Sequence, residues 1–411
     1  MSKPRPNSTT ESLSNIAAVA LTTASAFLLL VAVALNSPAL FYMSTAMIAT
    51  IGASRLQAWL SVRGLRFERT VPPVVRARDL VTIELTAWSL RKIRRPLIMV
   101  SDFLPERMVW QDLSPSLPIA PAFGQAISTQ YQFKPVRRGR YVWSRLAVFG
   151  SDALGLVTMS RKYETEPSEM LVLPDPLPLD LDFSSAAGWG FSEAEHGRSR
   201  GHGIEPRGVR QYFPGDALRH VHWRTTARTG QLMVKEFETG SQSGVSLYLQ
   251  TERGSDIGEG VDTTLERMCS HLAYSIKQFL RQGVAVQLPG RELDPETQPP
   301  QEREQNLMRL LAEIEAIDET PLSSRILSTI PELAPNNIVY VFVAVEDAGL
   351  PGAIGQLRRA GHDVTAVLYD AERFAPPKRK SSLSSATNPN FVDDLRDAGA
   401  TILLAPLGGA P

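Results

Sequence analysis

The sequence contains a single cysteine and no excess of either charge. Cys269 has no second cysteine to pair with, which excludes an internal disulfide framework and a cysteine-based zinc finger. The 43 Lys and Arg residues balance 43 Asp and Glu residues, whereas a protein that coats nucleic acid needs a basic surplus. We therefore expect no nucleic-acid partner. At 411 residues, the chain is long enough for two or three domains.

The common catalytic and nucleotide-binding signatures are also missing. The chain has no Gly-x-Ser-x-Gly nucleophile elbow, no Gly-x-x-x-x-Gly-Lys-Ser phosphate loop, no His-Glu-x-x-His zinc motif and no Gly-x-Gly-x-x-Gly dinucleotide loop. Cys269 falls on the apolar face of an expected helix, which indicates a buried, inert thiol. We expect no catalytic residue and no cofactor.

Two long uncharged runs stand near the N-terminus. Residues 16–35 contain neither a charge nor a proline, and residues 39–53 form a second uncharged run after Asn36-Ser37-Pro38. About 20 apolar residues are enough for a helix to cross a bilayer. We expect a two-helix transmembrane hairpin over residues 16–60. A cleaved signal peptide, which has a shorter apolar core, and a buried soluble hairpin are the alternatives.

Basic residues lie at both chain ends of this expected hairpin but not in the turn between its helices, so all of them fall on one side of the membrane. Lys3 and Arg5 precede it, and the turn between the two runs carries no charge. The arginines in or after its second helix are Arg55, Arg63, Arg66, Arg69, Arg76 and Arg78. Because positively charged flanks stay in the cytoplasm, we expect a multi-pass protein of the inner (plasma) membrane, with residues 1–15 and the later domains cytoplasmic. The unpaired cysteine agrees with a reducing compartment.

Residues 64–178 have the pattern of a β-domain. Apolar and polar side chains alternate over Val81–Thr86, as in a strand that is buried on one face. Further short apolar stretches are separated by turns that contain proline or glycine, such as Arg95-Pro96 and Arg138-Gly139. This spacing favours a small immunoglobulin-like β-sandwich.

Residues 244–411 alternate between expected strands and helices. Val245–Leu249 predicts a strand, Thr263–Leu280 a helix with one apolar face, and Ile338–Val345 a strand buried on both faces. Such alternation predicts a parallel, doubly wound α/β domain. Pro174, Pro176 and Pro178 lead into residues 179–243, whose first part contains several glycines, and we expect these residues to form a connector between the two soluble domains.

The connector contains the most specific pattern in the chain. Its characteristic residues are Arg207, Arg210, Tyr212, Pro214, Gly215, Asp216, Arg219, Trp223, Arg224, Ala227 and Arg228, followed by an expected strand at residues 234–238. This pattern resembles the signature of the bacterial domain-of-unknown-function family number fifty-eight. Upstream matches at Arg138–Tyr141, Ser151-Asp152 and Gly155-Leu156 extend the resemblance.

The resemblance implies a membrane-anchored protein whose C-terminal domain is like a von Willebrand factor A domain. It further implies a MoxR-type AAA+ ATPase as a partner, often alongside a transglutaminase-like membrane protein. No catalytic residues are established for the family, so the roles of the signature residues must be argued from their chemistry.

The signature residues allow two interpretations. Pro214-Gly215 suits a type II turn, and Asp216 can cap the segment that follows. Five arginines outnumber the carboxylates around them, and arginine pairs bidentately with carboxylates. The segment is therefore either an ion-pair lattice that holds the two soluble domains together or a docking surface for an acidic partner. Catalysis is the least favoured role.

Histidines and a tryptophan in the same region raise a further question. His196, His202, His220 and His222 lie in or just before the signature, and His220 and His222 would share one face of a strand. No third ligand has suitable spacing, so we expect no metal here. Trp223 is expected to be a buried wedge at the domain junction.

A von Willebrand-type domain usually binds Mg²⁺ through Asp-x-Ser-x-Ser after its first strand. In this chain Gln250, Glu252 and Gly254 stand at those positions, so a neutral amide replaces the first carboxylate. We therefore expect a degenerate site without metal. The carboxylates of Glu346 and Asp347, which follow the Ile338–Val345 strand, are the remaining oxygen ligands that could bind a metal ion at this position.

These observations favour a non-enzymatic, membrane-anchored adaptor or scaffold. It would work with a MoxR-type AAA+ ATPase in the assembly or maturation of envelope-associated proteins. An envelope-associated hydrolase that uses the Arg/His cluster is one alternative. A metal-dependent adhesion module is another, which Gln250 disfavours.

Overall fold

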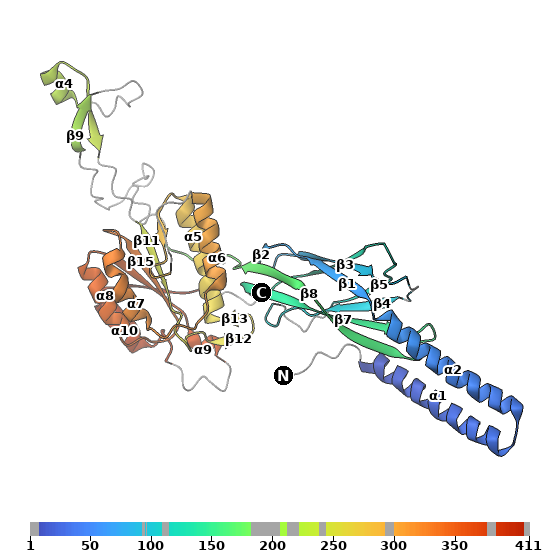
Figure 1. Cartoon of the computed structure of the whole chain (residues 1–411). Helices are drawn as coiled ribbons and strands as arrows, with labels where there is room; N and C mark the ends of the chain where they lie inside the picture. The colour runs from blue at the N-terminus through green and yellow to red at the C-terminus, as the bar shows by residue number, and fades with distance from the viewer. Residues whose placement is uncertain are drawn as a thin grey trace. The chain divides into compact units, whose positions relative to one another are not determined.

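The computed structural model describes residues 8–92, 95, 97–108, 115–181, 206–211, 222–237, 244–291, 300–375 and 384–406. Side chains are described within these ranges except at residues 8–18, 206–211, 234–237, 300 and 301. The chain divides into two compact units (Figure 1). The first comprises residues 1–175 and 309–313, and the second comprises residues 176–308 and 314–411.

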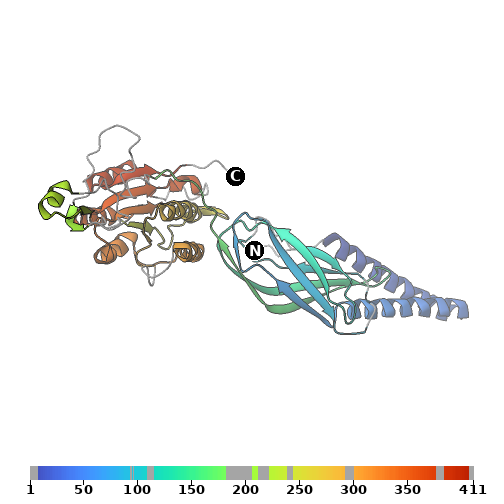
Figure 2. The same cartoon turned by 90° about the horizontal axis from the view of Figure 1, so that it is seen from above.

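The first unit begins with two antiparallel helices, α1 (Ser8–Ala34) and α2 (Pro38–Ser61), which lie side by side in Figures 1 and 2. Asn36 reverses the chain between them with a φ of 48°, a left-handed conformation that asparagine tolerates better than most residues. Pro38 suits the first position of α2 because the backbone N–H there has no partner within the helix.

The prediction of a transmembrane hairpin over residues 16–60 is contradicted. Among the described residues, no helix is both long enough and apolar enough to cross a membrane. In α2, hydroxyl side chains such as Ser44 and the charged Arg55 interrupt the apolar sequence, while the described side chains of α1 start only at Val19. The predicted multi-pass localisation in the inner membrane depended on these spans and is contradicted by the same finding.

Two β-sheets follow these helices in the first unit. One is antiparallel in the order β1-β3-β6, and the other has the order β2-β8-β7-β4-β5, in which β2 and β8 are parallel. The strands are β1 (Leu65–Thr70), β2 (Val74–Arg76), β3 (Val81–Ser89), β4 (Ile98–Asp102), β5 (Ser116–Ile119), β6 (Ile127–Phe133), β7 (Gly139–Ser151) and β8 (Thr158–Leu173). Every second residue of β3 is buried, as the alternation of its sequence predicts.

The core of this unit lies between the two sheets. Phe67 and Leu85 of the three-stranded sheet pack with Ile98 and Val148 of the five-stranded sheet. Figure 2 shows the strands of both sheets running along the length of this unit. The unit is therefore a β-sandwich in the literal sense, because side chains of both sheets fill one core. Its likeness to an immunoglobulin domain stays a prediction.

A buried ion pair crosses this core. Arg69 of β1 donates to both carboxylate oxygens of Asp102 of β4, at 2.6 and 2.8 Å, and neither side chain is exposed. The Tyr131 hydroxyl donates to the same carboxylate at 2.7 Å. The remaining donor of Arg69 reaches the Trp143 carbonyl and the hydroxyls of Thr165 and Ser168. The network joins both sheets and satisfies the buried charges.

The second unit contains a five-stranded parallel sheet in the order β14-β11-β15-β16-β17. The strands are β11 (Val245–Leu249), β14 (Val286–Gln287), β15 (Ile338–Val343), β16 (Asp363–Leu368) and β17 (Thr401–Leu404). Counted along the chain, this order is 2-1-3-4-5, a doubly wound arrangement. The likeness to a von Willebrand factor A domain stays a prediction.

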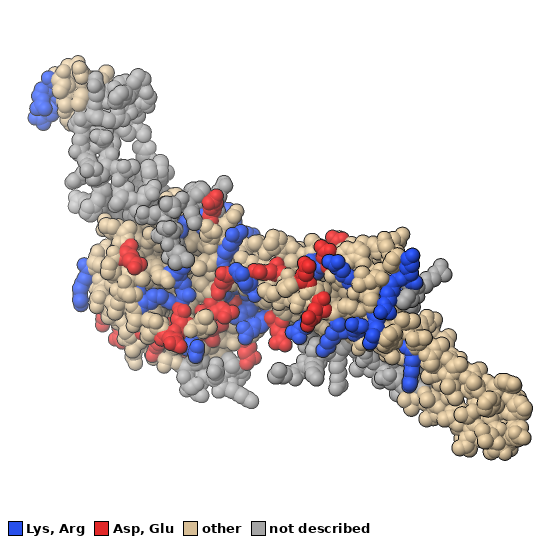
Figure 3. All heavy atoms as spheres, viewed as in Figure 1, with Lys and Arg blue, Asp and Glu red and all other residues tan. Residues whose placement is uncertain are grey.

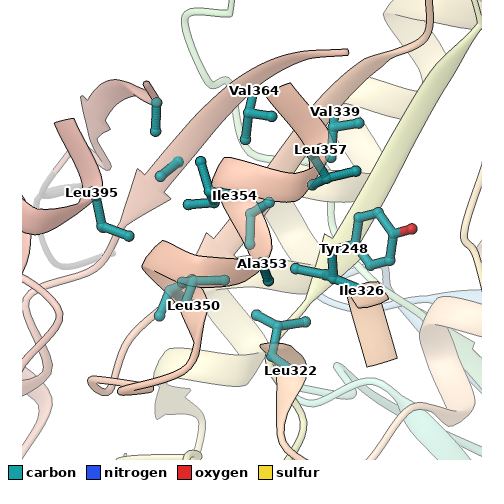
Figure 4. Packing of buried hydrophobic residues seen from close by; sticks show 14 of the residues in the cluster. Tyr248, Leu322, Ile326, Val339, Leu350, Ala353, Ile354, Leu357, Val364 and Leu395 are labelled. Atoms are coloured by element: carbon teal, nitrogen blue, oxygen red, sulfur yellow. The ribbon is translucent and has the colours of Figure 1, made fainter. Parts of the chain in front are cut away.

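Helices cover both faces of this sheet. The helices in this part of the chain are α5 (Thr264–Arg281), α6 (Pro300–Glu313), α7 (Leu322–Thr329), α8 (Leu350–Arg359), α9 (Ala371–Phe374) and α10 (Pro389–Asp397). A 3₁₀ turn at Ile330–Glu332 and a small ladder of β12 (Gly258–Glu259) with β13 (Asp262–Thr263) accompany them. Figure 4 shows Ile354 and Leu357 of α8 packed against Val339 and Val364 of the strands. On the other face Phe279 of α5 meets Tyr340.

A small arm belongs to the connector between the β-sandwich and the parallel sheet. Its antiparallel strands β9 (Pro206–Gln211) and β10 (Met233–Phe237) are in register from Gln211 opposite Met233, and α4 (Trp223–Thr229) lies between them in the chain (Figure 1). We call residues 206–211 and 222–237 the arm. It contains the described part of the sequence signature.

Candidate functional site

The parallel sheet has one position at which a ligand site is expected. In open α/β sheets, ligands bind beyond the carboxyl ends of the strands, where the strand order reverses. Here the reversal falls between β11 and β15. Gln250 follows β11, and Glu346 and Asp347 come shortly after β15. We call this region the switch-point edge.

Gln250 closes the switch-point edge. The side chain is 4% exposed, and its amide oxygen accepts hydrogen bonds from the backbone N–H groups of Ala344 and Val345, both at 2.9 Å. Its amide nitrogen donates to the Val345 carbonyl, also at 2.9 Å. The side chain therefore connects the end of β11 to the segment after β15, across the switch-point edge.

Two carboxylates of the chain itself occupy the N-terminus of α7. Glu252 accepts from the backbone N–H of Leu322, while Asp347 accepts from the backbone N–H of Ser323 at 2.8 Å and from its hydroxyl at 2.9 Å. A helix N-terminus attracts anions, and these internal side chains satisfy that preference. Burial raises the pKa of the Glu252 carboxyl above its ordinary value.

Two arginines complete the arrangement around Asp318. Its carboxylate pairs with Arg325 at 2.7 Å and with Arg291, and it accepts from the Thr251 hydroxyl at 2.6 Å. Arg325 also donates to the Leu249 carbonyl at the end of β11. Burial lowers the pKa of the Arg325 guanidinium, with the charge of Arg291 as the second cause. These cations connect β11 to the segments around it.

This geometry does not fit an Mg²⁺ site of the von Willebrand type. Both polar atoms of Gln250 are used in hydrogen bonds, and two guanidinium groups already supply positive charge near Thr251. The described residues include no group of three His, Cys, Asp or Glu side chains placed to hold a metal ion. Glu252 and Glu346 each have one buried oxygen without a hydrogen-bond partner in the described part of the chain. These two oxygens do not amount to a ligand set.

The arm differs from the switch-point edge, because the side chains of its helix are not buried. α4 has no buried residue, and Trp223 is 68% exposed. The prediction that Trp223 is a buried wedge is therefore wrong. Arg224 and Arg228 of the same helix are also exposed, and no ion pair joins them to another described residue. Leu232, just after the helix, is 42% exposed.

Local hydrogen bonds explain why this short helix forms. His222 precedes α4, and its Nδ1 atom accepts from the Thr225 backbone N–H at 3.2 Å, which caps the helix. Gly230 ends the helix in the left-handed conformation with a φ of 71°. His222 is thus an N-cap and not a strand residue, so the predicted pair of ring faces on one strand does not form. His196, His202 and His220 lie outside the described residues.

The other signature residues are only partly described. Arg207 and Arg210 lie in β9, where Arg210 is opposite Val234 of β10. Tyr212, Pro214, Gly215, Asp216 and Arg219 lie outside the described residues, as does the turn predicted at Pro214-Gly215. Among the signature residues, those of α4 therefore bear most directly on the choice between an ion-pair lattice and a docking surface.

Sequence reasoning missed the arginines of the switch-point edge. Thr251, Arg291, Asp318 and Arg325 are spread over 75 positions of the chain and form no spaced motif. Thr251 comes after β11 and Arg291 comes after β14, so both follow a strand at the same edge of the sheet. This shared position after expected strands is the signal in the sequence that could have predicted them as neighbours. Asp318 and Arg325 have no such signal.

The comparison with protein families finds a similarity in the central part of the chain. Residues 208–337 match the family described as "Protein of unknown function DUF58". This part of the chain is therefore similar to that family. A relative is the "Uncharacterized protein YeaD" of Bacillus subtilis (strain 168), which is 24% identical over 232 residues, or 55% of this chain and 56% of that protein. The chain thus spans about half the length of the curated relative it matches. The matched segment contains α4, β10, β11 and the residues of the switch-point edge up to Arg325.

Solved structures add little. The CARDB domain of a Pyrococcus furiosus protein is 16% identical, with 26% of this chain and 91% of that chain covered and a TM-score of 0.19. A superoxide reductase (neelaredoxin) from Ignicoccus hospitalis is 10% identical, with 28% and 85% covered and a TM-score of 0.17. Scores this low support no conclusion about either fold or activity.

Proposed function

We propose that this chain is a non-enzymatic adaptor that recruits a partner protein through the arm. The partner is a MoxR-type AAA+ ATPase, and the pair serves the assembly or maturation of envelope-associated proteins. The observation that carries the proposal is the exposure of Trp223, at 68%, in a helix that buries none of its residues. A tryptophan placed this way contributes nothing to a core and is available for contact.

The chemistry of α4 indicates what kind of surface it would meet. Its sequence, Trp-Arg-Thr-Thr-Ala-Arg-Thr, has two arginines and no carboxylate, and Figure 3 shows basic but no acidic side chains on this part of the arm. Tryptophan and arginine are the residue types that most often dominate binding energy at protein interfaces. The matching surface on the partner is acidic and has an apolar recess for the indole.

The switch-point edge supports the non-enzymatic part of the proposal. Gln250, Asp318 and Asp347 are each held by two or more hydrogen bonds or ion pairs within the chain. A group that is fixed in this way has to break those bonds before it acts on a ligand. The arrangement favours rigidity of the sheet over chemistry at its edge.

A binding measurement with the purified MoxR-type ATPase of the same organism tests the proposal. The wild-type chain should bind saturably, and Trp223→Ala should weaken binding by roughly 30-fold, the effect of losing a hot-spot residue worth about 2 kcal/mol. The double variant Arg224→Glu/Arg228→Glu should weaken it at least as much. Arg359→Glu, an exposed arginine on α8, is the matched control and should bind as the wild type does.

Salt provides a second readout. Binding through exposed arginines weakens as ionic strength rises, and the double arginine variant should lose most of this dependence. Equal binding by the wild type and all three variants, or no binding by the wild type, would refute the role of the arm.

A further inference from the structure

The β-sandwich carries a shallow groove that the proposed function does not use. It has a volume of about 570 Å³, within the range of about 300–1,000 Å³ of ligand sites. The segment that contains β2 and the residues just after it form one wall, and the outer faces of β3 and β6 form the other through Glu84 and Gln130. All of its lining residues belong to the first unit.

The walls of this groove combine aliphatic side chains with carboxylates. Val74 is 39% exposed and Leu80 is 59% exposed, so apolar surface faces the solvent here. Asp79 and Glu84 also line the groove, and no Lys or Arg is among its lining residues. An occupant that complements these walls has an aliphatic side chain next to a positive charge.

The strand beside the groove has a free edge. β2 is at the end of its sheet, and among the described strands it pairs with β8 alone. The Leu171 N–H donates to the Pro73 carbonyl and the Ala77 N–H to the Leu173 carbonyl, so the odd-numbered residues of this segment face β8. Val74 and Arg76 consequently direct their backbone groups away from β8. The Arg76 carbonyl accepts from the Asp79 N–H at 3.3 Å, which leaves both backbone groups of Val74 and the N–H of Arg76 without a partner among the described residues. Unpaired groups of this kind accept an added strand.

We propose that this groove binds a short extended segment of a partner protein, in which a Lys or Arg stands next to an aliphatic residue. The backbone of the segment pairs with the outer side of β2, its aliphatic side chain contacts Val74 and Leu80, and its cation lies near Asp79 and Glu84. The three residues of β2 limit the paired stretch to a few residues. The proposal is independent of the arm, which is basic and would bind a surface of the opposite charge.

Fluorescence anisotropy with the full chain tests this assignment. The probes are fluorescein-labelled pentapeptides, Ala-Val-Lys-Val-Ala and its counterpart with Glu in place of Lys, at low ionic strength. The wild type should bind the Lys peptide saturably and at least tenfold more tightly than the Glu peptide. Asp79→Lys/Glu84→Lys should reverse this preference, and Leu80→Ser should weaken binding of the Lys peptide.

Control variants separate the groove from other sites. Glu166→Lys changes an exposed carboxylate of β8 that does not line the groove, and it should leave the preference intact. Trp223→Ala should also leave it intact, which distinguishes failure of the groove from failure of the arm. Thermal unfolding of each variant shows that its fold is retained.

Three results would overturn the assignment. The first is an absence of saturable binding by the wild type, and the second is a Lys preference that survives Asp79→Lys/Glu84→Lys. The third is concentration-dependent self-association that the same double variant abolishes, because the occupant would then be a second copy of this chain and not a different protein.

Discussion

Replacement of Asp102 by alanine should destabilise the β-sandwich by about 3–5 kcal/mol, the cost of removing one partner from a buried ion pair. Arg69 and Asp102 are both fully buried and joined by two hydrogen bonds, of 2.6 and 2.8 Å. Without Asp102, the guanidinium stays in the core with only neutral acceptors, and the Tyr131 hydroxyl loses its acceptor.

A double variant separates the lost charge balance from the lost packing. Arg69→Met/Asp102→Ala removes both charges, so it should recover a large part of the stability that Asp102→Ala loses. Glu169→Ala is the matched control in the same sandwich, because Glu169 pairs with Arg140 at 2.8 Å while both side chains are more than half exposed. An exposed pair of this kind is worth about 0–1 kcal/mol.

Urea unfolding followed by tryptophan fluorescence measures these differences. All six tryptophans lie at or before Trp223, so the signal does not come from the parallel sheet. The midpoint should fall strongly for Asp102→Ala and little for Glu169→Ala. If Asp102→Ala costs less than about 1 kcal/mol, or if the double variant is no more stable than the single one, the account of the buried pair is refuted.

Two further predictions concern the parallel sheet. His271 hydrogen-bonds to Tyr369 at 2.7 Å, and burial lowers the pKa of its imidazole to about 4. The folded state therefore favours the neutral imidazole. The stability that this group contributes is fully present above pH 6.5 and is lost as the pH falls toward 4. Stability should drop by about 2 kcal/mol between pH 8 and pH 5 through this group, and His271→Gln should remove that part of the slope in unfolding followed by circular dichroism. Gln250→Ala should cost about 2–4 kcal/mol in the same assay, because it leaves the buried N–H of Ala344 and the part-buried N–H of Val345 without acceptors. Gln356→Ala, at an exposed position of α8, should change the stability little.

The elements that the sequence predicts well are those whose signal is local. The apolar spacing over Thr263–Leu280 predicts a helix, and α5 spans Thr264–Arg281 with Leu272 and Ile276 fully buried. Cys269 is fully buried on that helix, as its position predicts. Such features depend on residues three or four positions apart, and the sequence displays that spacing directly.

Features that depend on distant partners were missed or misread. The sequence places Arg69 among the basic residues expected to flank a membrane, yet Arg69 is buried against Asp102, 33 positions away. Gln250 was interpreted as a lost metal ligand, and the sequence does not show that its amide holds residues 94 and 95 positions further along. For Trp223, its large apolar side chain favoured burial, whereas α4 leaves it exposed.

The buried network between the sheets also affects the rates at which the sandwich folds and unfolds. Arg69 is bonded to residues 33, 96 and 99 positions away, so the network forms only after most of the sandwich has come together. Interactions that form late in folding are absent from the transition state, and they act on the rate of unfolding more than on the rate of folding. Arg69 and Asp102 therefore set mainly how long the folded sandwich persists before it opens, and have less influence on how quickly it forms.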